Sequence, residues 1–92
     1  MAKLNFKKFP CYTDIRRENK RDYDLQFDLA NQMYLNGSGI AMGALAMKIY
    51  NADGEQEYNE QECSIIIDFV KTLNPIIYDS IKDEIEAQKN NG

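Results

Sequence analysis

The alternation of apolar and polar residues predicts a strand near the start of the chain. In residues 3–9 (KLNFKKF), Leu4 and Phe6 alternate with polar neighbours, and Pro10 is expected to end the strand. Residues 10–20 are polar and basic, which is typical of a loop. This first strand needs a partner, and the next apolar segment, residues 21–29, is the candidate.

Residues 21–29 fit two periods. Tyr23, Leu25, Phe27 and Leu29 alternate with polar residues as in a strand, whereas Tyr23, Phe27, Ala30 and Tyr34 recur at helical spacing. We assign residues 21–26 to a strand that pairs with 3–9 as a hairpin, and residues 27–36 to a helix, although length and composition do not decide between the two periods.

Helix-capping residues divide the remainder of the chain. Gly37 is placed to end a helix in a left-handed conformation, and Ser38 is placed to begin the next one. Asn59 followed by Glu62 forms a capping-box pattern, and Asn74 precedes a proline suited to a first helical turn. The helices are therefore expected at 27–36, 39–50, 60–73 and 75–88.

The predicted fold is α+β and mainly α: an N-terminal two-stranded β-hairpin followed by about four helices in one compact domain over residues 1–92. Residues 1–26 form the basic hairpin, residues 27–88 an acidic helical body and residues 89–92 a frayed tail. The helix over 39–50 is apolar on nearly every side, so we expect it to be central and buried.

Composition argues against an enzyme and against a bound cofactor. The chain has no histidine, which removes the usual general base and the commonest metal ligand. Cys11 and Cys63 are too few for a zinc site of cysteine and histidine and are read as reduced thiols. No apolar run is long enough to span a membrane and no signal peptide is recognised, so a cytoplasmic protein is expected.

Charge is unevenly distributed along the chain. Residues 1–21 carry seven basic and two acidic residues, a net charge of +5, whereas residues 22–92 carry four lysines and thirteen carboxylates, a net charge of −9. The basic segment could contact nucleic acid phosphates, or it could form ion pairs with the acidic helices of its own chain. Its candidate residues are Lys7, Lys8, Arg16, Arg17, Lys20 and Arg21.

One twelve-residue segment has oxygen-bearing side chains at a characteristic spacing. Residues 51–62 (NADGEQEYNEQE) offer Asn51, Asp53, Glu55, Glu57 (through its carbonyl), Asn59 and Glu62 as ligands. The segment resembles the calcium loop of the EF-hand family, which implies a calcium site between two helices. It departs from the family at Gln56, where a glycine is usual. The alternative is a turn joining two helices, the second one capped.

We expect the chain to act by binding another protein. The helix over 60–73 has a second apolar stripe, Ile65 and Phe69, and the next helix offers acidic residues Asp79, Asp83 and Glu86 as a supporting surface. A second copy of the chain is an alternative partner. In size, acidity and lack of catalytic groups, the chain is similar to the small accessory proteins, inhibitors and assembly chaperones of phages and mobile elements.

Overall fold

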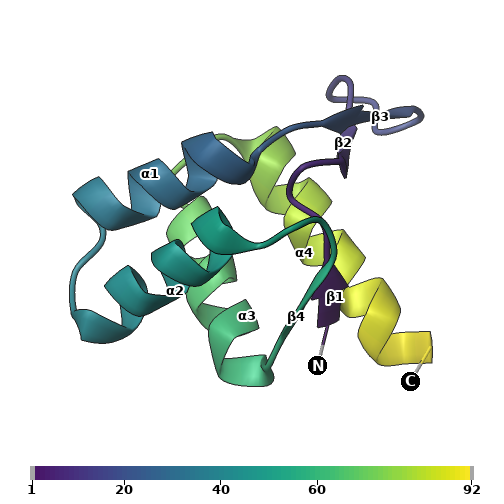
Figure 1. Cartoon of the computed structure of the whole chain (residues 1–92). Coiled ribbons are helices and arrows are strands. Elements are labelled where there is room, and N and C mark those ends of the chain that lie inside the picture. Colours follow the sequence, from purple (N-terminus) through teal and green to yellow (C-terminus); the bar gives the residue numbers. More distant parts are fainter. Residues whose placement is uncertain (1, 92) are drawn as a thin grey trace.

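The computed structural model describes residues 2–91, and the side chains of residues 2–89. Residues 2–91 form four short strands and four helices, arranged as in Figure 1. The predicted fold class, α+β and mainly α, is confirmed. In chain order the elements are β1 (Ala2–Leu4), β2 (Phe9–Tyr12), β3 (Lys20–Tyr23), α1 (Gln26–Asn36), α2 (Ile40–Asn51), β4 (Gln56–Tyr58), α3 (Glu60–Val70) and α4 (Pro75–Asn91).

The N-terminal hairpin is present, but it is built from other residues than predicted. β2 pairs antiparallel with β3, with Phe9 opposite Tyr23 and Tyr12 opposite Lys20. The predicted single strand over 3–9 is wrong, because a turn divides it: the side chain of Asn5 accepts a hydrogen bond from the backbone N–H of Lys7, and its carbonyl accepts one from Lys8. An Asx turn of this kind gives the backbone an alternative to the strand.

Pro10 lies inside β2 and does not end a strand, which corrects a second expectation. Tyr12, two residues further on, donates its backbone N–H to Ser80 Oγ of α4 at 3.0 Å. Alternate residues of a strand present their backbone groups on the same side, so the nitrogen of Pro10 also faces away from β3. A proline there removes no hydrogen bond of the hairpin.

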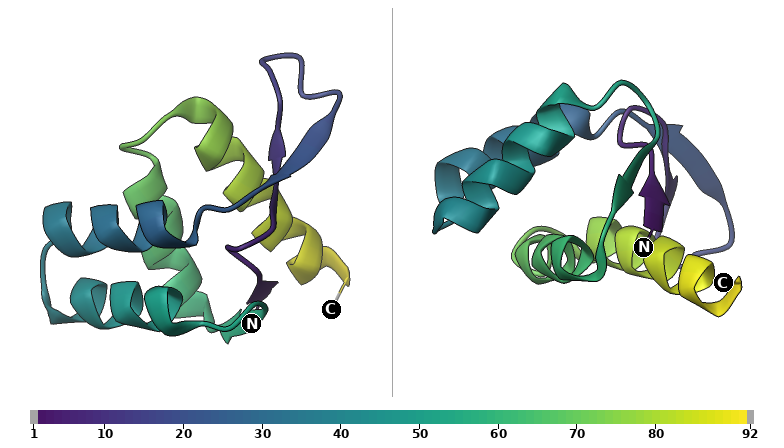
Figure 2. Two further views of the ribbon diagram at one scale, coloured as in Figure 1. Left: turned by 45° about the horizontal axis from the view of Figure 1, so that its top comes forward. Right: turned by 60° about the horizontal axis from the view of Figure 1, so that its bottom comes forward.

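β1 lies between β4 and α4, as the two views of Figure 2 show. It pairs antiparallel with β4, a three-residue strand that the sequence pattern does not predict. On its other edge, the side-chain amide of Gln88 in α4 bonds to the backbone of Lys3. Gln88 Oε1 accepts a hydrogen bond from the Lys3 N–H, and Gln88 Nε2 donates one to the Lys3 carbonyl, both at 2.7 Å. The Gln88 amide thus replaces a third strand and covers an edge that would otherwise be open to pairing.

The helices begin near the predicted residues, and two predicted caps are confirmed. Asn59 and Glu62 form a capping box at the start of α3, at 2.8 and 2.9 Å, and Asn74 Oδ1 accepts the N–H of Ile77 in the first turn of α4. Helix α3 ends at Val70, earlier than residue 73, whereas α4 continues to Asn91. Residues 89–91 are therefore helical and not frayed, and residue 92 of the predicted tail lies outside the described residues.

The turn between α1 and α2 differs from the prediction. Gly37 is not left-handed, with φ −79°, and Gly39 adopts the positive φ of 92°. Ser38 does not cap α2, because the residue before the helix is Gly39 and no side chain bonds there. Gly37 is still required, since a Cβ at that position would collide with the side chain of Met42.

The core is formed by β1, the 5–8 turn, β2 and one side of each helix. Phe6 stacks on Phe9 with ring centroids 5.4 Å apart and meets the edge of Tyr58 at 5.8 Å. Helix α2 contributes Leu45, Ala46 and Ile49, but its other side is exposed, so the prediction of a central, fully buried helix is wrong. Among residues 2–91, no helix has the length and apolar composition needed to cross a membrane.

Candidate protein-docking surface

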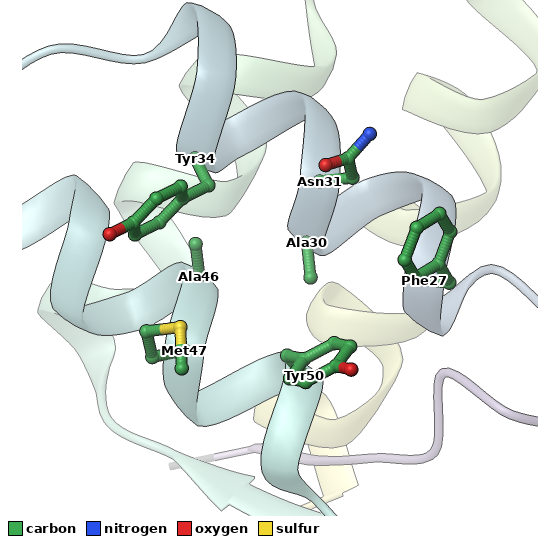
Figure 3. A pocket seen from close by; sticks show the side chains of 7 residues that line it. All are labelled: Phe27, Ala30, Asn31, Tyr34, Ala46, Met47 and Tyr50. Carbon is green, nitrogen blue, oxygen red and sulfur yellow. The ribbon is translucent and has the colours of Figure 1, made fainter.

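Helices α1 and α2 pack against each other as an antiparallel pair (Figure 1). One side of the pair carries exposed aromatic residues. Helical spacing places Phe27, Asn31 and Tyr34 in one row on α1, and Met47 and Tyr50 one turn apart on α2. Figure 3 shows these side chains around a slot whose floor is Ala30 and Ala46. We call this surface, formed by the seven residues Phe27, Ala30, Asn31, Tyr34, Ala46, Met47 and Tyr50, the aromatic face.

The walls of the aromatic face are exposed, although their side chains are large and mostly apolar. Phe27 is 60% exposed, Tyr34 61%, Met47 44% and Tyr50 52%. Phe27 and Tyr50 meet edge to face with centroids 6.3 Å apart, which closes one end of the slot. The slot holds about 210 Å³, and a cavity of about 150 Å³ is enough for a benzene ring. The surface can therefore accept at least one large apolar side chain.

The aromatic face carries no formal charge. Residues 26–51 include only two charged residues, Asp28 and Lys48, and neither lines the slot. The Lys48 ammonium lies 2.9 Å from the Glu62 carboxylate, toward α3. The polar groups in the slot wall are the Asn31 amide and the two tyrosine hydroxyls. Depletion of charge with enrichment of tyrosine, phenylalanine and methionine is typical of the centre of protein interfaces.

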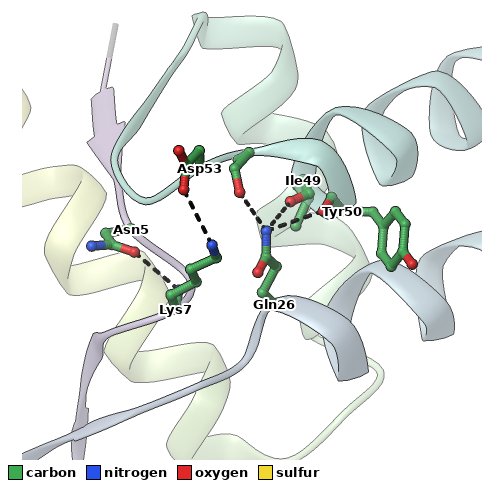
Figure 4. Close-up of polar contacts among 7 residues, drawn as sticks. Asn5, Lys7, Gln26, Ile49, Tyr50 and Asp53 are labelled. Atoms are coloured by element: carbon green, nitrogen blue, oxygen red, sulfur yellow. Dashed lines mark hydrogen bonds and ion pairs between the residues drawn. The ribbon is translucent and has the colours of Figure 1, made fainter.

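A single side chain fixes the two helices at one end of the aromatic face. Figure 4 shows Gln26, the first residue of α1, with its amide nitrogen directed at the C-terminus of α2. Its Nε2 donates to the carbonyls of Ile49, Tyr50 and Ala52 at 3.0, 3.1 and 2.6 Å. The last carbonyls of a helix have no partner within the helix, and Gln26 supplies one from the neighbouring helix. Beside it, Lys7 reaches Asp53 at 3.4 Å.

The residues predicted to bind a partner occupy different environments. Phe69 is 8% exposed and belongs to the core, and Ile65 is half-buried against that core. The stripe that was expected on the surface therefore packs inside the molecule. Asp79 and Asp83 face the β2–β3 hairpin of the same chain, and Glu86 is exposed. These five residues do not form one continuous exposed surface.

The basic segment is largely engaged with acidic groups of its own chain. Arg17 Nη2 lies 2.6 Å from Asp79, and the Tyr12 hydroxyl donates to Asp83 at 2.6 Å. The hydrogen bond to Asp83 raises the pKa of Tyr12 above its ordinary value. Of the other candidate residues, Arg16 pairs with Asp14, Lys7 with Asp53, and Lys20 lies over the Tyr12 ring; Lys8 and Arg21 are exposed. Three of the six candidate cations thus form ion pairs within the chain, and one of them, Arg17, pairs with the acidic helix α4.

The EF-hand-like segment, residues 51–62, consists of the last residue of α2, a turn, strand β4, and the N-cap and first residues of α3. Asn51 ends α2, Asp53 pairs with Lys7, and Glu57 lies in β4 opposite Lys3. Glu55 is exposed in the turn, while Asn59 and Glu62 bond to each other as a capping box. Within residues 2–91, no three cysteine or acidic side chains are grouped as metal ligands. The geometry observed is that of the capped turn.

Three buried side chains with reactive or titratable groups are shielded from water. Cys11 and Cys63 are free thiols, and burial raises the pKa of both. Tyr58 is fully buried, its hydroxyl has no hydrogen-bond partner, and burial raises its pKa to about 12. A nucleophile or base needs a lowered or matched pKa and access to a substrate, and these groups have neither.

Sequence reasoning did not find the aromatic face, because helical spacing is visible in the sequence but the exposure of the side chains is not. Tyr34 lies seven residues after Phe27, and Tyr50 three residues after Met47, so each pair lies on one side of its helix. Met47 and Tyr50 belong to the helix over 39–50 that was expected to be buried, and Phe27 and Tyr34 were used only for the period of their segment. Comparison of the chain with protein-family models, with curated proteins and with solved structures gave no match.

Proposed function

We propose that this chain is a small, non-enzymatic protein-binding protein and that the aromatic face is its docking surface. The observation that carries the proposal is the one-sided packing of α2. A helix that is apolar on all sides is normally covered on all sides. Here the chain covers Leu45, Ala46 and Ile49, while Ile40, Met47 and Tyr50 remain exposed.

The extent of the exposed apolar area supports a binding role. An aromatic side chain has about 150–250 Å² of surface, so the exposed parts of Phe27, Tyr34 and Tyr50 together present about 250–450 Å². Met47 and Ile40, which is 93% exposed and continues the row along α2, extend this surface. Contiguous apolar patches above a few hundred Å² on a soluble protein usually serve an interaction.

We propose an accessory type of function, as inhibitor, adaptor or assembly chaperone, and this surface is compatible with it. Such proteins act through occupancy of a partner and need no reacting group. The partner is expected to present an apolar helix or loop with one large side chain that fills the slot, because the slot offers contact area and a few neutral hydrogen-bonding groups but no charge. The basic hairpin contributes less, since Lys7, Arg16 and Arg17 already form ion pairs within the chain.

A capture experiment with matched variants tests the proposed function. The chain is immobilised and exposed to nuclease-treated lysate of its source cell, and the same is done with Met47→Asp and with Ile15→Asp. Both side chains are exposed and apolar, but Ile15 lies in the loop between β2 and β3, away from the aromatic face. We expect a stoichiometric protein that is retained by Ile15→Asp and lost with Met47→Asp. Capture that is insensitive to Met47→Asp contradicts the proposal.

A further inference from the structure

We infer that the occupant of the aromatic face is a second copy of this chain, docked so that the two α1–α2 pairs form a four-helix dimer. This inference rests on the proposed function, because it names the partner of the same surface. Two copies related by a twofold axis present the same residues to each other, so the surface must be compatible with itself in shape and charge.

The charge of the aromatic face meets this requirement. The chain has a net charge of −4, and two copies would repel each other if their acidic residues met. The aromatic face has no charged residue in its lining, and twelve of the thirteen carboxylates after residue 21 lie outside α1 and α2. Exposed charges further apart than about 8 Å are largely screened at physiological salt. The face is thus the part of this acidic protein on which two copies can meet without like charges in contact.

The absence of charge on the aromatic face also favours a second copy of the chain over a transient partner of another kind. Partners that associate and dissociate are usually selected by complementary charges at the interface. Homodimer interfaces are more apolar and resemble a divided core. The polar groups in the slot lining are the Asn31 amide and the tyrosine hydroxyls, which are neutral and can both donate and accept, so they can pair with the same kinds of group on a second copy.

Shape and area are consistent with this assembly. The slot is closed at one end by Phe27 and Tyr50, and Tyr34 and Met47 stand around it at the other end (Figure 3). In an antiparallel twofold arrangement, Tyr34 of each copy reaches the slot of the other. A specific interface buries about 600–1,000 Å² on each partner. The exposed parts of Phe27, Tyr34 and Tyr50 supply about 250–450 Å² of this area. Met47, Ile40 and the polar residues around the slot supply the remainder in the proposed dimer.

Sedimentation equilibrium of the full chain tests the inference, at concentrations from about 1 µM to 1 mM, which cover the affinities of weak and moderate dimers. We expect the mass of two chains, and an at least tenfold higher dissociation constant for Tyr34→Asp and for Met47→Asp, because each substitution places a carboxylate in the apolar contact twice, once from each copy. Ile15→Asp should dimerise like the wild type. Both face residues are exposed, so their variants should keep the circular dichroism spectrum of the wild type.

The dependence of the melting temperature on protein concentration is a second test of whether the chain dimerises. The melting temperature of a dimer rises with protein concentration, whereas that of a monomer does not. A monomeric wild type up to the highest concentration, or a dimer that survives both face variants, overturns the inference. A monomer that still captures another protein through Met47 overturns the dimer and leaves the proposed function standing, and a monomer that captures none overturns both.

Discussion

Replacement of Gln26 by methionine should destabilise the protein, because one amide holds the C-terminus of α2 to the start of α1. Nε2 has two hydrogens shared among three carbonyls, of Ile49, Tyr50 and Ala52. Two net hydrogen bonds at about 0.5–1.5 kcal/mol each give a loss of about 1–3 kcal/mol. A chain of this length has a free energy of unfolding of about 5–14 kcal/mol, so the loss is a substantial fraction of it.

The assay is urea unfolding followed by far-UV circular dichroism, with thermal unfolding as a check. Each 1 kcal/mol lowers the melting temperature of a small domain by about 4–8 °C. Methionine keeps the length and helix propensity of the side chain but removes the donor. Gln61→Met, at an exposed position of α3, is the matched control and should change little. A Gln26→Met variant within about 0.5 kcal/mol of the wild type, the usual range for a surface substitution, would refute the role of the amide.

Three further substitutions have effects that the structure fixes in sign. Tyr58→Phe removes a buried hydroxyl without a partner and should leave stability unchanged or raise it by about 1 kcal/mol in urea unfolding; a loss above that value would contradict the unpaired state. Gly43→Ala should raise the free energy of unfolding by about 0.5–1 kcal/mol, and with it the melting temperature, because an added Cβ meets no atom within 4 Å and alanine favours the helix. A lower melting temperature would show that the position is crowded. Burial acts to raise the pKa of Glu62, but the hydrogen bond from the Asn59 N–H and the Lys48 ammonium together hold that pKa below its usual value. The ionised Glu62 carboxylate therefore stabilises the fold at neutral pH, and this stabilisation is lost as the pH falls through the lowered pKa. The deficit of Glu62→Gln relative to wild type should therefore shrink in acid, and a deficit that is constant with pH would contradict this assignment.

The features of the fold that depend on local sequence could be predicted. Capping residues act within three positions, so Asn59, Glu62 and Asn74 placed the starts of α3 and α4 correctly. The division of residues 21–29 between a strand and a helix was also close to the structure, with β3 ending at Tyr23 and α1 starting at Gln26. Each of these features is determined by neighbouring residues.

The pairing of strands and the sidedness of helices could not be predicted, because both depend on residues far apart in the chain. β4 has three residues, of which only Tyr58 is apolar, and it is a strand because β1 lies beside it. Asn5 divides the first apolar segment through a turn that its side chain stabilises. For α2, an all-apolar sequence shows that each side can be buried but not which side the rest of the chain covers.

The same uncertainty applies to the exposure of single aromatic residues. Phe69 and Tyr34 are both aromatic residues at helical spacing with apolar neighbours, and the sequence does not distinguish them. In the structure, Phe69 is 8% exposed and Tyr34 61%. Helix α3 packs against α4, and Phe69 belongs to the buried core cluster, whereas α1 and α2 pack chiefly on each other and leave Tyr34 uncovered.

The position of β1 between β4 and α4 has a consequence for how the chain folds during its synthesis. Lys3 is made early, but the Gln88 amide that covers its edge follows 85 residues later. At about 5–20 residues per second, the strand waits about 4–17 seconds for that partner. Leu4 is buried only in the finished fold, so in the meantime β1 is an apolar segment with unpaired edges, which a chaperone or another nascent chain could bind. The α1–α2 pair, whose contacts are local, can form in that interval, so the surface proposed for docking would be complete before the fold that supports it.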